Sequence, residues 1–182
     1  YSAQVEPGQS VAVIGCGGVG MTAVALLSAT RKAKVVAIDP DPAKREAALA
    51  YGAALAFDPG EPDAARTIGK ACAMNIAGAV DFVGSESSSA LGVNLVRRTG
   101  QVVIVGLFGG ELRMPLPLFP LKSLRLTGSY VAGLNELREL VALAQRVALP
   151  QTPIELRPMA GVNQALGDLA QARPGLRLPG AL

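Results

Sequence analysis

Short apolar runs alternate along this chain with longer stretches in which apolar residues recur every three or four positions. The apolar runs, which are rich in Val, Ile, Ala, Phe and Leu, lie at 11–14, 34–38, 53–57, 79–83, 101–105 and 124–129. The stretches of helical period lie at 18–30, 42–51, 63–73 and 87–96. Strands that alternate with helices are typical of a parallel sheet with helices on both faces. The pattern therefore predicts an α/β fold, with a doubly wound, six-stranded parallel sheet.

The last third of the chain breaks this pattern. Residues 134–147 have apolar positions at three- and four-residue steps, which predicts a covering helix whose apolar face packs on the core. Beyond 147, prolines interrupt the chain and only 162–172 has a helical period. We therefore expect one sheet domain at 1–149 and a short C-terminal segment at 150–182. The apolar, proline-rich stretch at 114–121 is expected to be a loop, which either packs on its own core or exposes an apolar surface.

Composition narrows the class of protein. The 182 residues are 50% hydrophobic and 17% charged, with a net charge of +3, which is typical of a globular chain with one core. The basic residues are scattered, so no nucleic-acid surface is expected. Residues 11–30 carry no charge, but four glycines within 15–20 argue against a membrane span. We expect no secretory signal and a cytoplasmic location, in a piece of a longer protein because the chain opens with Tyr1.

The chain is poorly equipped for catalysis by its own side chains. It has no histidine, which is the commonest general base and a principal zinc ligand. Its two cysteines, Cys16 and Cys72, have no metal-ligand spacing and are expected to be reduced and partly buried. We therefore predict no catalytic residue and no metal site.

A glycine-rich turn follows the first apolar run and opens the first helical stretch. It comprises Gly15, Cys16, Gly17, Gly18, Val19 and Gly20, which match the pattern G-x-G-x-x-G. In this pattern the first glycine makes a tight turn, the second lets the backbone approach a pyrophosphate, and the third lets the helix pack closely on the strand. The start of the helix is itself an anion site. The turn therefore predicts binding of a dinucleotide on a Rossmann fold.

Asp39 strengthens this prediction. It ends the second apolar run, nineteen positions after Gly20, where an acidic residue would accept hydrogen bonds from the adenosine ribose. Because its charge would repel a 2′-phosphate, we predict NAD rather than NADP, although Arg45 lies nearby and leaves the other choice open. The alternative is that Asp39 is only a turn residue in the sequence Asp-Pro-Asp-Pro.

These residues resemble the cofactor-binding domain of the medium-chain, zinc-type alcohol dehydrogenases. The resemblance covers most of the chain, from the entry into the first strand to the Gly-Ser step after the sixth strand. It implies that Asp39 and Lys44 contact the adenosine ribose and that Val19 packs behind the nicotinamide. Without the resemblance, Lys44 would be interpreted as a solvated charge on a helix and Val19 as a buried helix residue. The resemblance also implies that four residues line the nicotinamide side, namely Val83, Val105, Gly106 and Leu107. Without the resemblance, these four would be strand core followed by a glycine turn.

In that family, the zinc ligands, the proton relay and most of the substrate pocket belong to a preceding domain. The resemblance thus implies hydride transfer between an alcohol or aldehyde and NAD in the intact enzyme, with zinc only in that other domain and with this chain inactive alone. It also implies a homodimer that pairs through the edge of the sixth strand. Two other interpretations stay open: a dinucleotide-sensing or scaffold module without catalysis, and the cofactor domain of a zinc-free quinone or enoyl reductase. An acid at position 39 argues against the reductase.

Overall fold

The chain is described by a computed structural model. The structure describes residues 8–30, 33–147, 149 and 156–170. Two compact units divide the chain, Tyr1–Pro150 and Gln151–Leu182. The first unit holds the whole sheet and the candidate site.

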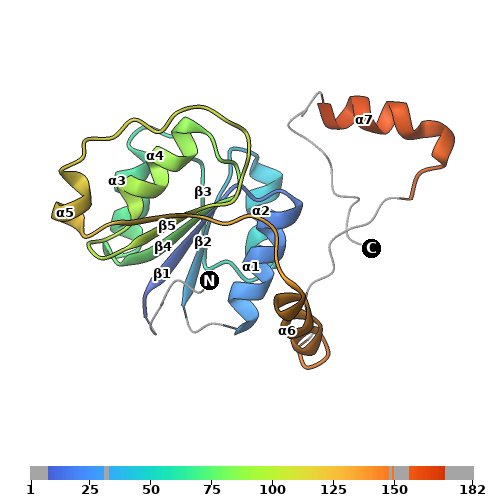
Figure 1. Ribbon diagram of the computed structural model, residues 1–182, viewed down its shortest axis with the longest axis horizontal. Helices are drawn as coiled ribbons and strands as arrows, with labels where there is room; N and C mark the ends of the chain where they lie inside the picture. Colours follow the sequence, from blue (N-terminus) through green and yellow to red (C-terminus); the bar gives the residue numbers. More distant parts are fainter. Residues whose placement is uncertain (1–7, 31–32, 148, 150–155, 171–182) are drawn as a thin grey trace. The chain divides into compact units, whose positions relative to one another are not determined.

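A six-stranded parallel sheet forms the centre of the first unit (Figure 1). Its strands are β1 (Ser10–Ile14), β2 (Lys34–Ile38), β3 (Leu55–Phe57), β4 (Ile76–Asp81), β5 (Gln101–Ile104) and β6 (Arg125–Gly128). Their spatial order is β3-β2-β1-β4-β5-β6, and every neighbouring pair is parallel. This is the strand order of the dinucleotide-binding Rossmann fold, in which ligands lie where the order reverses, beside β1. The predicted fold class is confirmed.

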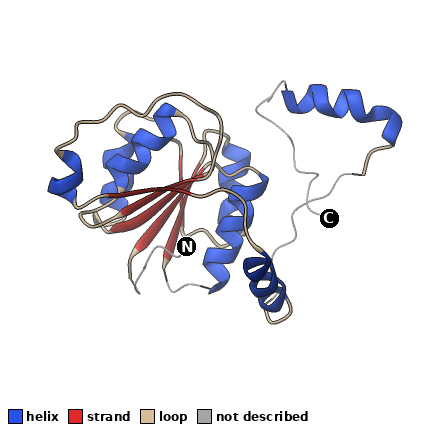
Figure 2. Cartoon of the chain, viewed as in Figure 1, coloured by secondary structure: helices blue, strands red, loops and turns tan. Residues whose placement is uncertain are grey.

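Helices cover both faces of the sheet (Figure 2). The helices of the first unit are α1 (Gly18–Thr30), α2 (Pro42–Ala50), α3 (Ala64–Ala71), α4 (Glu86–Leu95), α5 (Leu118–Lys122) and α6 (Leu134–Ala144). Alternate strand residues supply the two cores between sheet and helices. In β1, Val13 packs in a core with α1 and α2, whereas Ala12 and Ile14 pack in a second core with α3 and α4. The central strands β1, β2 and β4 are thus buried on both faces, which explains their nearly continuous apolar runs, whereas the edge strands β3 and β6 are only partly buried.

Two strands differ from their predicted bounds by two residues or more, for local reasons. β4 covers 76–81 rather than 79–83, because Ile76 already pairs with Ser10 and because the chain turns back directly after Asp81. β3 begins at Leu55 rather than at position 53, because the Ala53 amide still bonds to the Ala48 carbonyl at the end of α2.

The stretch at 114–121 is not all loop. Its second half forms α5, which we did not predict, and which is held by Lys122, whose Nζ donates to the carbonyls of Val93 and Val96 at the end of α4. Phe119 and Met114 pack against the core, whereas Leu116 and Leu121 are exposed. Both interpretations of this stretch are therefore correct in part.

The expected burial of the next helix is wrong. α6 begins at Leu134 as predicted but ends at Ala144, and its apolar residues Leu137 and Val141 are about half exposed, at 53% and 50%. Because α1 to α4 already cover the two faces of the sheet, α6 has no sheet surface to cover.

The second unit is described over residues 156–170. It contains a 3₁₀ turn at Met159–Gly161 and α7 (Val162–Ala170), where a helix was expected at 162–172; positions 171 and 172 lie outside the described residues. Arg157 forms an ion pair with Asp168 at 2.8 Å. Across the described parts of both units, no helix has the length and apolar character that a membrane crossing needs.

Candidate cofactor site

The turn between β1 and α1 depends on two glycines that the fold itself requires. Gly15 has a φ of +86°, and a Cβ at this position would meet Val83 Cγ2 at 2.6 Å. A Cβ on Gly20 would collide with the carbonyl oxygen of Gly15. These two glycines therefore let α1 begin directly against the end of β1.

The glycines between them face open space. A Cβ on Gly17 or on Gly18 would meet no atom within 4 Å, so these positions do not need glycine for packing. The first amides of α1 lie at this same place, where an anion is favoured by their free N–H groups and by the helix dipole. Val19 is 68% exposed, which shows that the alternative of a buried helix residue is wrong. The turn thus presents an apolar side chain and unpaired helix amides on an open surface.

Asp39 joins this turn to the end of β2. Its side chain is only 4% exposed, and its Oδ2 accepts a 2.8 Å hydrogen bond from the Cys16 amide. Its Oδ1 accepts a 2.9 Å bond from the Asp41 amide, so the turn role that the sequence left open is present as well. Because each carboxylate oxygen can accept more than one hydrogen bond, Asp39 keeps acceptor capacity for a ligand.

The Cys16 side chain behind this bond is chemically quiet. Burial raises the pKa of the Cys16 thiol from 9.0 to about 12, and the charge of Asp39 acts in the same direction. Lys44 on α2 is close enough for its positive charge to lower this pKa in part.

Arg45 is also held at this corner. Its Nη1 donates to the carbonyl oxygens of Asp39 and Pro40, each at 2.8 Å, and forms a 3.0 Å ion pair with Asp58 Oδ2. Asp58 follows β3, and its other oxygen accepts from the Gly60 amide at 2.8 Å. The guanidinium is thus directed at main-chain carbonyls and at one carboxylate.

Asp81 organises the other half of the site, and the sequence analysis missed it. Its carboxylate is fully buried and accepts four hydrogen bonds. Two come from main-chain amides and two from hydroxyl groups, with the donors Val83 N, Gly84 N, Ser88 Oγ and Ser89 Oγ at 2.8–3.0 Å. This ties the turn after β4 to the first turn of α4. The available signal was an aspartate at the end of a buried strand with serines a few positions later.

The turns after β4 and β5 touch each other. A Cβ on Gly84 would collide with the Gly106 carbonyl, and a Cβ on Gly106 would collide with the main chain of Val83. The amides of Phe108 and Gly109 donate to the carbonyls of Val83 and Gly84, at 3.1 and 3.0 Å. The two turns therefore form one connected wall beside β1.

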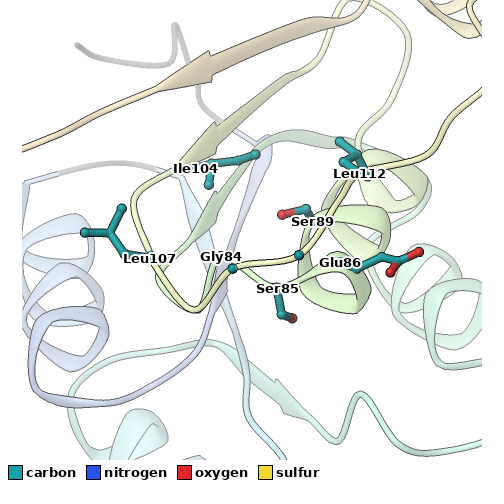
Figure 3. Close-up of a pocket in the computed structure, with 10 residues that line it drawn as sticks. Gly84, Ser85, Glu86, Ser89, Ile104, Leu107 and Leu112 are labelled. Carbon is teal, nitrogen blue, oxygen red and sulfur yellow. The ribbon is translucent and has the colours of Figure 1, made fainter.

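Cavities open at this edge of the sheet, and two of them border the predicted site residues. The larger of these two, of about 660 Å³, reaches from Gly15 and Asp39 to Val83 and along α4. The smaller, of about 310 Å³, lies beside the joined turns, between Ser85, Ile104 and Leu112, with Leu107 at its margin (Figure 3). The larger cavity is within the volume range of ordinary ligand pockets. Within the described residues, no group of three or more Cys, Asp and Glu side chains is arranged to hold a metal ion.

Comparison with known proteins identifies the family. The family model described as zinc-binding dehydrogenase matches residues 18–146, which is most of the chain. The chain belongs to the zinc-binding dehydrogenase family.

Individual relatives agree with this assignment. A probable D-xylulose reductase A from Aspergillus terreus is 32% identical over 146 residues, which cover 78% of this chain and 41% of the relative. L-galactonate-5-dehydrogenase from Escherichia coli K12 is 35% identical over 131 residues, which cover 70% and 37%. The crystal structure of an alcohol dehydrogenase from the archaeon Aeropyrum pernix matches with a TM-score of 0.85 and 31% identity, over 93% of this chain and 48% of that one. The chain thus spans less than half the length of each of these zinc-binding dehydrogenase relatives.

The structure gathers the predicted site residues at one edge of the sheet. The turn 15–20 and Asp39 are joined by a hydrogen bond, Val83 contacts Gly15, and Val105, Gly106 and Leu107 follow β5. Val83 and Val105 lie beyond the ends of their strands rather than within them. That these residues hold a cofactor stays a prediction. The residues that the sequence analysis missed are Asp81, Gly84, Ser88 and Ser89, which shape the wall.

Proposed function

We propose that this chain binds a nicotinamide dinucleotide, prefers NAD to NADP, and serves as the cofactor-binding part of an alcohol dehydrogenase-like oxidoreductase. The observation that carries the proposal is the position of Asp39. A buried carboxylate with spare acceptor capacity lines a cavity of about 660 Å³ and is hydrogen-bonded to the glycine turn at the start of α1. This arrangement suits a ribose hydroxyl next to a pyrophosphate.

The residues present suit the parts of such a cofactor. The open surface at Gly17 and Gly18 leaves room for a pyrophosphate against the first amides of α1. Asp39 accepts from the ribose hydroxyls, and Lys44 contributes attraction. Val19 provides an exposed apolar surface for the nicotinamide ring, and the wall formed by Val83, Val105, Gly106 and Leu107 closes the opposite side. When bound, NAD supplies the hydride acceptor of the reaction.

The preference for NAD follows from charge at the ribose. A 2′-phosphate would lie against the Asp39 carboxylate, which is already held by two main-chain amides and has little freedom to withdraw. Arg45 does not offset this repulsion fully, because it is paired with Asp58. Two like charges in a partly dehydrated pocket repel strongly.

We propose that the intact enzyme transfers hydride between NAD and an alcohol or aldehyde. Support comes from the relatives, whose names describe a xylulose reductase, a galactonate dehydrogenase and an alcohol dehydrogenase. We place the catalytic zinc and the substrate pocket in the part of the enzyme that this chain does not cover, and we propose that this chain alone is inactive. We also propose that the edge of β6, which is the last strand of the sheet, pairs with a second copy.

The test is calorimetric titration of this chain with NAD and with NADP, followed by an assay for alcohol-dependent NAD reduction. We expect tighter binding of NAD and no turnover. Equal or tighter binding of NADP would contradict the cofactor preference, and zinc-dependent turnover by this chain would contradict the proposed division of labour.

A further inference from the structure

The ion pair between Arg45 and Asp58 lies directly behind the residue that we assign to the ribose. Arg45 follows Asp39 by six positions, and its guanidinium donates to the Asp39 carbonyl at 2.8 Å, so it lies beside the place where a 2′-phosphate would lie. Its Nη1 is nevertheless engaged by the Asp39 and Pro40 carbonyls and by Asp58, all within 3.0 Å. The lining of the large cavity includes Asp39, Pro40 and Pro59 but neither Arg45 nor Asp58. Arg45 is therefore held by these three acceptors and does not line the cavity.

We propose that Asp58 determines the choice between NAD and NADP by holding Arg45 in this position. The inference rests on the proposed function and names the residue that controls the specificity of its site. Asp58 is a positioning residue, since it acts on the cofactor through Arg45.

Two features make Asp58 suited to hold Arg45, and a third fixes the direction of Arg45 itself. Its side chain is itself fixed, because Oδ1 accepts from the Gly60 amide while Oδ2 binds Arg45. The pair is partly buried, with side-chain exposures of 23% for Arg45 and 27% for Asp58, so water competes less with it than with a pair on the open surface. Finally, the carbonyls of Asp39 and Pro40 supply two further acceptors, which fix the direction of the guanidinium.

Release of Arg45 would reverse the electrostatics of the corner. A free arginine one turn into α2 has a long, flexible side chain and would find a 2′-phosphate a stronger partner than main-chain carbonyls. Loss of the Asp58 charge would also remove one source of repulsion. The same change leaves NAD with its contacts at Asp39, because NAD has no group at this position for Arg45 to bind.

The experiment measures dissociation constants of NAD and NADP by calorimetry for the wild-type chain and for Asp58→Asn. Asparagine keeps an oxygen for the Gly60 amide but loses the charge that holds Arg45. We expect the ratio of the NADP constant to the NAD constant to fall by about fivefold to tenfold, which is the effect of one added charge-assisted hydrogen bond less the cost of ordering it.

Two further variants distinguish the effect of the Arg45–Asp58 pair from a general effect of charge. Asp41→Asn removes a negative charge at the same corner without touching the Arg45–Asp58 pair, and asparagine still caps α2. Its ratio is expected to change by less than about twofold. In an Arg45→Gln background, Asp58→Asn is expected to lose most of its effect. An equal response to Asp41→Asn, or an effect that persists without Arg45, would overturn the inference.

A cofactor-free measurement keeps the two proposals distinguishable. Urea unfolding of the wild type, Arg45→Gln, Asp58→Asn and the double variant forms a double-mutant cycle. We expect the free energy of unfolding to fall less in the double variant than the sum of the falls in the two single variants. Folded variants whose cofactor ratio is unchanged contradict this inference alone. A folded wild-type chain that binds neither cofactor contradicts the proposed function and the inference with it.

Discussion

The main-chain amide of Cys16 donates a 2.8 Å hydrogen bond to the carboxylate of Asp39. Together with the bond from the Gly15 amide to the Ile38 carbonyl, this bond joins the turn after β1 to the end of β2, so that the glycine turn and the acidic residue are fixed together before any ligand is present. Groups held in place beforehand cost less entropy to order on binding. The predictions below test what each part of this arrangement contributes.

Asp39→Asn should weaken NAD binding and also lower the free energy of unfolding, because the buried carboxylate accepts from the amides of Cys16 and Asp41. The amide group keeps one acceptor oxygen but presents N–H groups where the carboxylate accepted hydrogen bonds. Because hydrogen bonds to a charged group contribute about 1.5–3 kcal/mol, we expect the NAD dissociation constant to rise by roughly tenfold to a hundredfold. Calorimetry measures this, with Asp41→Asn as the matched control. A rise of the same size in Asp41→Asn would show that general charge, rather than contact, is responsible.

Gly17→Val and Gly20→Ala should fail in different ways. Valine at position 17 meets no protein atom and should cost only about 1 kcal/mol at the helix start, while its side chain fills the space that we assign to the pyrophosphate. Alanine at position 20 collides with the Gly15 carbonyl and should lower the free energy of unfolding by more than about 2 kcal/mol. Urea unfolding and NAD titration, measured together, separate the two effects.

Gly128→Val is the control for this pair. A Cβ at Gly128 also faces open space, and it lies in β6, away from the glycine turn. It should leave both unfolding and NAD binding close to those of the wild type. If Gly17→Val binds NAD as well as Gly128→Val does, the pyrophosphate does not lie on this turn.

The stability of the chain should depend on Cys16 at high pH. Its pKa is about 12 in the folded chain and 9.0 in the ordinary thiol, so between these values the unfolded chain releases a proton that the folded chain keeps. The protonated Cys16 thiol contributes fully to the stability of the folded chain below pH 9. This contribution is lost as the pH rises toward 12, by up to about 1.4 kcal/mol per pH unit. Urea unfolding from pH 8 to 10.5 should show a fall in the free energy of unfolding of the wild-type chain, and a smaller fall in Cys16→Ala. The fall should remain in Cys72→Ala, which alters the other buried cysteine.

Asp81→Asn should destabilise the wall on the nicotinamide side. The asparagine amide faces donors that the carboxylate satisfied, and we expect a loss of about 3 kcal/mol in the free energy of unfolding. Hydrogen exchange should accelerate at the amides of Val83 and Gly84, which donate to this side chain. Ser89→Ala removes one donor only and should have a clearly smaller effect on both measurements. Unchanged exchange at these two amides would show that Asp81 does not hold the turn.

The glycine turn and Asp39 could be predicted from the sequence because their chemistry is local. Gly15 and Gly20 follow a buried strand at fixed spacing, and Asp39 ends the next strand, so the parallel sheet brings them to one edge. The six parallel strands followed from the alternation of apolar runs with helical stretches.

The remaining parts depend on contacts that no local pattern reveals. Asp81 lies close in sequence to Ser88 and Ser89, but the pattern does not show that both hydroxyls donate to its carboxylate. Arg45 and Asp58, thirteen positions apart, look like two ordinary surface charges until β3 lies beside β2. The five-residue α5 is held by Lys122 reaching across to α4, and the exposed face of α6 has the same spacing as a buried one.

The contact between Gly84 and Gly106 has a consequence for changing the substrate or cofactor range of such a chain. Neither position accepts a side chain, since a Cβ on either would meet the other turn's main chain. Variation in this wall is therefore confined to the side chains that flank the contact, Val83 and Leu107 among them. In a mutant library that randomises both turns, most members carry a side chain at Gly84 or Gly106 and disrupt the contact. A library that keeps these two glycines samples changes of shape and polarity without moving the backbone.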